Sequence, residues 1–337
     1  MNRFVSFLHI FGIVSIIVGH SMYNGYMVYL HSWIYCFWLS VVFYASGWLL
    51  GHSVMKDGKT ASSISLNPTD AFWIKKYKRL LVPYIVLNSL IYLPKGLLSQ
   101  FVMRPYDISF EDYVYAMFHP FESPNGEYWF MPALIMIFYL FVLLAKMAVF
   151  VPERLRVLCY VVGVAACVWL YMLIGDDTLG RVFYYLIFFA AGYLSRKKGL
   201  LLQPMKYDVP VFFVSFALSL LSIRSDLEYG VFFVFYTTAG TVMAVALSSI
   251  YVRKGWKCID HLFGTNMTIY LYHWFVQGTI WALYRYSGLE GEPYEFAHRL
   301  LAVVLGIYLP YLLYLFMKKY SSNAVVKVLR FISGEKI

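Results

Sequence analysis

The sequence predicts an all-α integral membrane protein, a polytopic chain with about ten transmembrane helices. Hydrophobic residues make up 61% of the 337 residues and charged residues only 14%, whereas about a quarter of a soluble chain is charged. Aromatic residues reach 20%, which suits many helix ends at lipid–water interfaces, where amphipathic rings prefer to lie. The first apolar run has no small-residue cleavage site, so we interpret it as a retained helix rather than a signal peptide.

Apolar stretches long enough to cross a bilayer, at roughly 20 residues each, follow one another along the whole chain. They cover residues 4–22, 29–51, 80–103, 128–149, 157–174, 180–195, 208–223, 230–251, 265–284 and 297–317. The connections at 175–179 and 224–229 are short, so the helices that flank each of them are expected to form an antiparallel hairpin. Because no repeat, low-complexity tract or linker interrupts the series, we assign residues 1–337 to a single domain.

The distribution of basic residues predicts the orientation of these helices. With both termini in the cytoplasm, 22 of the 28 basic residues fall in cytoplasmic segments, as the positive-inside rule requires. The six others are Lys95, Arg104, Arg181, Arg224, Arg285 and Arg299. The net charge of +10 is therefore mainly a signal of membrane topology, with lipid as the partner it implies, and it gives no reason to expect nucleic acid.

The first predicted helix carries two histidines, His9 and His20, in an otherwise apolar run. Their separation of eleven residues turns the helix about 20° beyond three full turns, so both lie on one stripe, about 16 Å apart along the axis. Ionisable side chains inside membrane helices usually face protein or a water-filled cavity, and histidine can both take and give a proton near neutrality. His20 is therefore a candidate catalytic base. The alternative is a structural histidine that is hydrogen-bonded to a neighbouring helix.

The second predicted helix contains the pattern Phe43-x-x-Ser46-Gly47-x-Leu49-Leu50. Small residues let two membrane helices approach closely, so the pair Ser46-Gly47 by itself is typical of helix packing.

A basic run formed by Lys75, Lys76, Lys78 and Arg79 precedes the third predicted helix. Cations beside a helix N-terminus form a candidate phosphate or pyrophosphate site, because the helix dipole and the cationic donors both favour anions there. The alternative, which the spacing alone favours, is a stop-transfer cluster that also touches anionic lipid.

Two later helices carry aromatic residues beside polar ones. Trp129, at the start of the fourth predicted helix, is by itself typical of an interface anchor. His273 lies in the ninth predicted helix, with Tyr270 and Tyr272 close in sequence, and is either a third functional histidine or a satisfied buried one. The four cysteines do not have the spacing of a metal site or of a disulfide framework, so no metal is expected.

In this order, the patterns resemble the acyltransferase 3 family of integral membrane acyltransferases, which O-acylate cell-surface glycans. Each signature alone is weak, but six of them in the same order, between about residues 6 and 280, form a specific signal. The matching signatures are Val18-Gly19-His20-Ser21, Phe43-x-x-Ser46-Gly47, Leu80-x-x-Pro83-Tyr84, Trp129-Phe130-x-x-Ala133-Leu134, Phe188-Phe189-x-x-Gly192-Tyr193 and Ile269-Tyr270-Leu271-x-His273.

The resemblance implies an enzyme of the cytoplasmic (inner) membrane that moves an acyl group from cytoplasmic acetyl-CoA, or another acyl-CoA, to a hydroxyl of a cell-surface or lipid-linked saccharide. His20 would be the catalytic base, with His9 and His273 as further catalytic candidates. Lys76 and Arg79 would hold the phosphates of the donor. The remaining candidates are Lys75 and Lys78 for the donor, and Ser21, Ser46 and Trp129 for the acceptor substrate.

The chain departs from the family pattern at position 9. There the family has an arginine, with ten residues between it and the histidine, and this chain has His9. A protonated His9, or Arg3 reaching in from below, would take over the orientation of an anion. The family's paired arginines before the third helix are here Lys76-x-x-Arg79, and lysine keeps the charge but loses the bidentate fork of arginine.

Two other functions stay open. A transporter or flippase for lipid-linked sugar would share the ten-helix form, but such proteins commonly carry intramembrane carboxylates, and no Asp or Glu lies in the middle of a predicted span. A catalytically silent relative is the second, suggested by His9 in place of the arginine.

Overall fold

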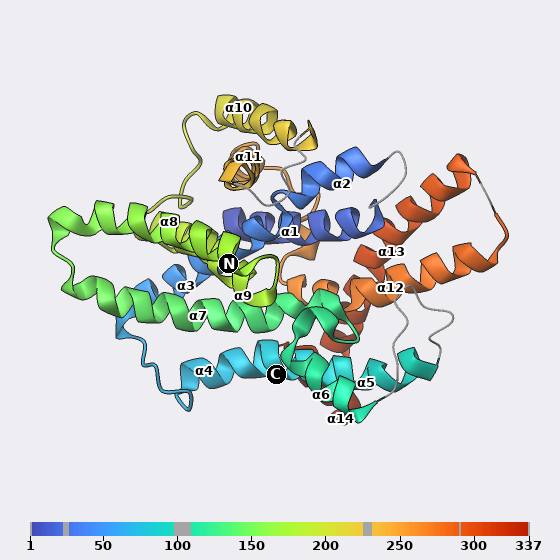
Figure 1. Ribbon diagram of the computed structural model, residues 1–337. Coiled ribbons are helices and arrows are strands. Elements are labelled where there is room, and N and C mark those ends of the chain that lie inside the picture. Colours follow the sequence, from blue (N-terminus) through green and yellow to red (C-terminus); the bar gives the residue numbers. More distant parts are fainter. Residues whose placement is uncertain (1, 23–26, 98–108, 225–230, 290, 336–337) are drawn as a thin grey trace. The chain divides into compact units, whose positions relative to one another are not determined.

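The computed structural model describes residues 2–22, 27–97, 109–224, 231–289 and 291–335, and these form helices and turns without a strand (Figure 1). The prediction of an all-α fold is therefore confirmed for the part of the chain that the structure describes. These residues belong to two compact units. The first is drawn from residues 1–19, 23–70 and 136–263, and the second from residues 20–22, 71–135 and 264–337.

Within the described ranges, seven helical segments are long and apolar enough to cross a membrane. They are Arg3–Ser21, Val28–Lys56, Ala71–Leu97, Gly126–Phe150, Glu153–Ile174, Phe232–Arg253 and Glu292–Lys319. A further apolar helix, Asp208–Ile223, is shorter. The predicted spans at 180–195 and 265–284 form α9 (Thr178–Lys197) and α12 (Asn266–Tyr286), which carry more polar residues. The chain is thus a polytopic helical protein with the composition of a membrane protein.

Two predicted helices have different boundaries in the structure. The stretch 29–51 is divided into α2 (Val28–Tyr35) and α3 (Trp38–Lys56), because Phe37 has φ −132° and ψ −13° and leaves the helical conformation. Phe37 is buried, and a Cβ on Gly240 would lie only 2.4 Å from the Cβ of Phe37. Close packing at Phe37 therefore accompanies the break, and hydropathy alone did not reveal it.

The predicted third helix begins earlier than expected. A short helix, α4 (Ala71–Lys76), continues through a π-helical turn, Tyr77–Leu81, into α5 (Val82–Leu97). The last residues of the predicted range 80–103, from 98 onward, lie outside the described residues, as does residue 230 of the range 230–251. The basic run therefore lies inside a continuous helical segment, and the expectation that it stands at a helix N-terminus is wrong.

The first unit is built around the contact between α3 and α9, and it also contains α1 (Arg3–Ser21) up to Gly19. Its other helices are α2, α8 (Arg156–Ile174), α10 (Asp208–Leu220), α11 (Val231–Arg253) and the part of α7 (Phe130–Met147) that follows Ile135. The α10 and α11 helices pack against each other, as do α8 and α9.

The second unit is built around the antiparallel pair α12 and α13 (Glu292–Lys319), drawn in orange to red in Figure 1. It also contains α4, the π turn, α5, the start of α7, and two helices too short to span a membrane, α6 (Phe110–Phe118) and α14 (Ala324–Ile332). The short helices were not predicted, although both begin at a capping residue. Ser109 caps α6, and Asn323 caps α14 by accepting from the Val325 N–H at 2.9 Å.

Candidate functional site

A histidine–glutamate pair lies in the second unit. His20 lies at the C-terminal end of α1, and Glu127 lies in the 3-10 turn Gly126–Trp129 that leads into α7. The His20 Nε2 atom is 3.1 Å from a Glu127 carboxylate oxygen, and the side chains are only 15% and 16% exposed. A carboxylate at this distance orients an imidazole and stabilises its protonated form, which is the relation that general acid–base catalysis uses.

His273, on α12, lies beside this pair. The rings of His20 and His273 stack with centroids 5.8 Å apart and an interplanar angle of 18°, and Trp274 meets the His20 ring edge-on at 5.2 Å. The His273 Nδ1 atom lies 2.7 Å from the Tyr270 carbonyl oxygen. Since a carbonyl only accepts hydrogen bonds, Nδ1 donates and the Nε2 atom of the neutral ring keeps its lone pair. This Nε2 atom is buried and has no hydrogen-bond partner among the described residues.

Two tyrosines hold the glutamate turn against α12. The Tyr270 hydroxyl donates to the Glu127 carbonyl oxygen at 2.6 Å, and the Tyr128 hydroxyl donates in the opposite direction, to the Leu271 carbonyl oxygen. Both tyrosines are buried. Because the two hydrogen bonds cross between the same two backbone segments, they fix Glu127 close to the helix that carries His273.

Ser21, the residue after His20, is bound from two helices. The Gln277 side-chain nitrogen on α12 donates to the Ser21 hydroxyl oxygen at 2.6 Å. Arg299, on α13, donates from Nη1 to the Ser21 carbonyl oxygen at 2.9 Å and forms an ion pair with Glu295. The predicted substrate-binding residue Ser21 is therefore part of a hydrogen-bonded network at the end of α1.

The structure thus brings together three of the predicted site residues, His20, Ser21 and His273, in the second unit. Trp129 belongs to the same unit, where it is buried and stacks on Phe121 with centroids 4.9 Å apart. This contact gives Trp129 a packing partner, and its role in binding the substrate stays a prediction. The other predicted substrate residue, Ser46, is buried in α3 of the first unit.

The basic run also belongs to the second unit. Lys75, Lys78 and Arg79 are exposed, and Lys76 is half-buried with its Nζ atom 5.3 Å from the centroid of the Phe72 ring. Arg79 lies in the π turn. There the Val82 N–H donates to the carbonyl oxygen of Tyr77, five residues earlier, whereas in an α-helix it would donate to the carbonyl four residues earlier. Lys78 and Arg79 therefore lie in the π turn itself, directly after Lys75 and Lys76 at the end of α4.

Gly334, near the C-terminus, packs closely against this turn. It has φ +63°, and a Cβ at this position would lie 2.5 Å from the Arg79 carbonyl oxygen. We expect Gly334→Val to lower the free energy of unfolding, with backbone strain alone contributing about 1–3 kcal/mol, and to lower the melting temperature in detergent. Gly255→Val is the control for strain alone, because Gly255 has φ +67° but nothing within 4 Å of its Cβ position. An equal loss of stability in both variants would show that the contact with Arg79 contributes nothing.

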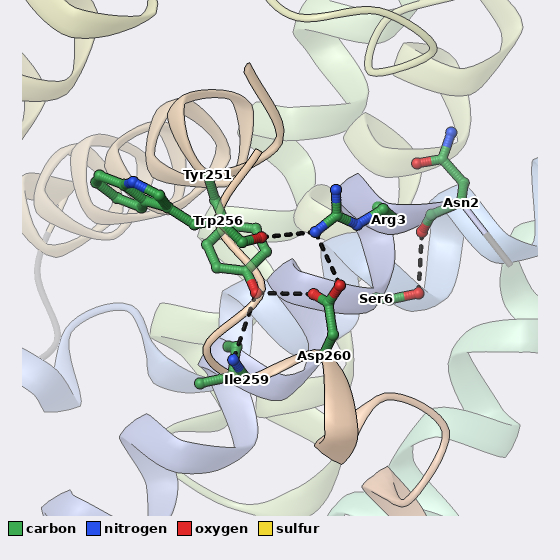
Figure 2. Close-up of polar contacts among 7 residues, drawn as sticks. All are labelled: Asn2, Arg3, Ser6, Tyr251, Trp256, Ile259 and Asp260. Atoms are coloured by element: carbon green, nitrogen blue, oxygen red, sulfur yellow. Dashed lines mark hydrogen bonds and ion pairs between the residues drawn. The ribbon is translucent and has the colours of Figure 1, made fainter. Parts of the chain in front are cut away.

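His9 and Arg3 lie in the first unit. His9 is half-buried on α1. Arg3, which we considered as a substitute for the missing arginine, donates to an Asp260 carboxylate oxygen at 2.8 Å and to the Trp256 carbonyl oxygen (Figure 2). Asp260 also accepts from the Tyr251 hydroxyl at 2.7 Å. Arg3, at the start of α1, is therefore held in a structural ion pair by the segment that follows α11.

Glu127, Gln277 and Arg299 belong to this site but were not among the residues predicted from the sequence. Glu127 directly precedes the predicted span 128–149, so it was counted as an outer-loop residue, but the apolar segment in the structure begins at Gly126. Glu127 is the second residue of that segment, at its end, so the expectation that no carboxylate lies in the middle of a span is not contradicted there. Arg299 was likewise counted only as an outer basic residue, and its position seven residues after the start of α13 was the one signal available.

The chemistry of the site is that of proton transfer by imidazole and carboxylate. In the parts of the chain that the structure describes, no group of three or more His, Cys, Asp or Glu side chains could hold a metal ion. A histidine paired with a glutamate, beside a second histidine with a lone pair, can remove a proton from a bound alcohol and return it to a leaving group.

Comparison with protein families gives one match. A family model described as an acyltransferase domain matches residues 2–315, which is nearly the whole chain. Comparisons with curated proteins and with solved structures gave no match.

Proposed function

Because the chain belongs to the acyltransferase domain family, we propose that it is a membrane O-acyltransferase that moves an acyl group, with acetyl as the first candidate, from acyl-CoA to a saccharide hydroxyl. The observation that carries the proposal is the part-buried His20–Glu127 pair beside the lone pair of His273. Ionisable side chains are expensive at membrane depth and are retained for function.

In the proposed reaction, the imidazole of His20 takes the proton of the saccharide hydroxyl as its oxygen attacks the thioester carbonyl. Glu127 stabilises the positive charge that then forms on His20. The carbon–sulfur bond breaks, the thiolate of CoA leaves, and the proton passes from His20 to that sulfur. His273 accepts a hydrogen bond at Nε2 from a neighbouring hydroxyl of the same saccharide and so orients the acceptor, which makes it a second catalytic residue.

The donor is proposed to bind at the basic run, with Lys76 and Arg79 on its phosphates and Lys75 and Lys78 beside them. The support is their charge and the exposure of three of the four side chains, since phosphate binding uses cationic donors. His9 lies on α1, the helix that also carries His20. In place of the family's arginine, His9 is proposed to orient the acyl chain or the thioester. Ser46 and Trp129 are proposed to shape the path of the acceptor through packing.

We further propose one transmembrane domain of ten helices with both termini in the cytoplasm, placed in the inner membrane. The support is that α9, α10 and α12 form where three of the ten spans were predicted, and that basic residues concentrate in the segments assigned to the cytoplasm. The acceptor is then a polysaccharide or lipid-linked glycan that reaches the membrane surface.

The pairing of His20 with Glu127 favours a second candidate, a proton-coupled transporter or flippase of lipid-linked sugar, because histidine and glutamate also form proton relays. One experiment separates the two. The purified protein in lipid vesicles receives acetyl-CoA and a lipid-linked saccharide, and free CoA thiol and the mass of the saccharide are measured. Release of thiol with one added acyl group supports the enzyme. Movement of unmodified saccharide across the vesicle without thiol release would exclude it.

The donor site makes its own prediction. Arg79→Gln removes one charge-assisted hydrogen bond to a phosphate, so we expect the KM for acyl-CoA to rise roughly tenfold. The kcat should change little, because the phosphates of CoA are far along the molecule from its thioester. Lys318→Gln, at the exposed end of α13, is the matched control and should leave KM unchanged. An unchanged KM in Arg79→Gln and Lys76→Gln would place the donor elsewhere.

A further inference from the structure

We propose that Arg299 is a positioning residue for His20: it fixes the end of α1 so that the His20 ring faces Glu127 and His273. The proposal rests on the proposed function, because the reaction it serves is the acyl transfer assigned to His20. It adds a residue that the sequence patterns did not indicate.

Arg299 is a buried charge within an apolar helix. It is 6% exposed and stands about 10 Å along α13 from Glu292, at the rise of a regular helix. This helix is among those apolar enough to cross a membrane. A guanidinium buried in such a helix is expensive unless paired, and it usually marks a functional region. Glu295, one turn earlier on α13, supplies the pairing charge.

Arg299 binds a backbone carbonyl at the end of α1. The last carbonyl groups of a helix have no N–H partner within the helix, and the C-terminal end of a helix attracts positive charge. Arg299 donates to the Ser21 carbonyl oxygen at 2.9 Å, at the last residue of α1. The guanidinium therefore satisfies this carbonyl and joins the end of α1 to α13.

The carbonyl that Arg299 binds is next to His20 in the chain. The peptide group that Arg299 binds follows His20 directly, and the Ser21 side chain is held independently by Gln277 at 2.6 Å. Two helices thus fix the backbone next to His20, while the His20 ring contacts Glu127, His273 and Trp274. Loss of the Arg299 contact would free the end of α1 and the direction of the catalytic ring without removing any group that touches substrate.

The fork of arginine is needed for this role. One guanidinium reaches the Ser21 carbonyl through Nη1 and Glu295 through Nη2, whereas a lysine has a single ammonium and lacks the fork. Arg299→Lys should therefore keep the buried charge and the fold but hold α1 less firmly. We expect a fall in kcat of about tenfold to 10²-fold, with the KM for acyl-CoA unchanged.

The experiment compares Arg299→Lys, Arg299→Met and Glu295→Gln with wild type, measuring kcat, KM and the melting temperature in lipid vesicles. Arg285→Met is the matched control, because Arg285 is an exposed arginine at the end of α12, where it lies over the Trp281 ring. The expected result is a loss of kcat in the order Met, then Lys, with a normal KM, and wild-type kinetics in the control.

Two outcomes would overturn the inference. Wild-type kcat in a folded Arg299→Lys and Glu295→Gln would show that His20 needs no such support. A rise in KM without loss of kcat would make Arg299 a binding residue instead. If Arg299→Met does not fold, the Lys and Gln variants still decide. A His20→Ala variant measured alongside keeps the two proposals apart: if it is fully active, the proposed function fails, and if it is inactive while Arg299→Lys has wild-type kcat, only the present inference fails.

Discussion

His20→Ala should reduce the kcat of acyl transfer by about 10²- to 10⁴-fold, the contribution that a positioned general base makes. The structure gives the reason: His20 has a carboxylate 3.1 Å from Nε2 and a second imidazole stacked on its ring. Without the imidazole, the proposed base that takes the hydroxyl proton and passes its charge to the pairing with Glu127 is lost. The measurement is the rate of CoA thiol release with saturating donor and acceptor, with the protein in lipid vesicles.

Glu127→Gln tests the same pair from the other side. The amide keeps the shape of the side chain but carries no charge to stabilise a protonated His20, so kcat should also fall. His119→Ala and Glu122→Gln are matched controls, since both residues are exposed and lie in the same unit. Transfer at the wild-type rate in His20→Ala, with the protein folded, would remove His20 from the mechanism.

The site could be predicted from the sequence only where a residue is informative by itself. His20 and His273 stand out because ionisable side chains are rare in apolar helices, and the sequence indicated both. Their stacking depends on how α12 packs beside the end of α1, which no local pattern encodes. Glu127 was missed because hydropathy alone does not show that the turn Gly126–Trp129 is part of the apolar segment.

The fold shows the same division between local and tertiary information. Long apolar runs gave the positions of the helices, since the length needed to cross a bilayer is a local property. The break at Phe37 and the π turn at Tyr77–Leu81 lie within runs that remain compatible with helix, and packing decides them. Position 9 is a histidine and not the arginine expected from the resemblance. Arg3 does not replace that arginine, because it forms an ion pair with Asp260.

Gly47 is the position where a small residue has the clearest structural purpose. A Cβ there would lie 1.9 Å from the Phe189 carbonyl oxygen, and a Cβ on Gly192 would lie 2.0 Å from the Tyr44 carbonyl oxygen. Each glycine of the α3–α9 pair thus packs on a carbonyl of the other helix, three residues before the other glycine. The interpretation of Ser46-Gly47 as a helix-packing pair is confirmed at Gly47.

Ordinary overpacking of a core costs about 1–3 kcal/mol. Gly47→Leu should destabilise the protein by more than this, because the Phe189 carbonyl belongs to the backbone and cannot rotate away as a side chain can. We expect little folded protein after extraction in mild detergent, and a much lower melting temperature for Gly47→Ala. Gly163→Ala on α8 is the control: nothing lies within 4 Å of its Cβ position, and alanine favours a helix over glycine by about 0.5–1 kcal/mol. The control should be as stable as wild type or slightly more so. Equal stability of Gly47→Ala and Gly163→Ala would contradict the close backbone contact between α3 and α9, on which the packing of the first unit depends.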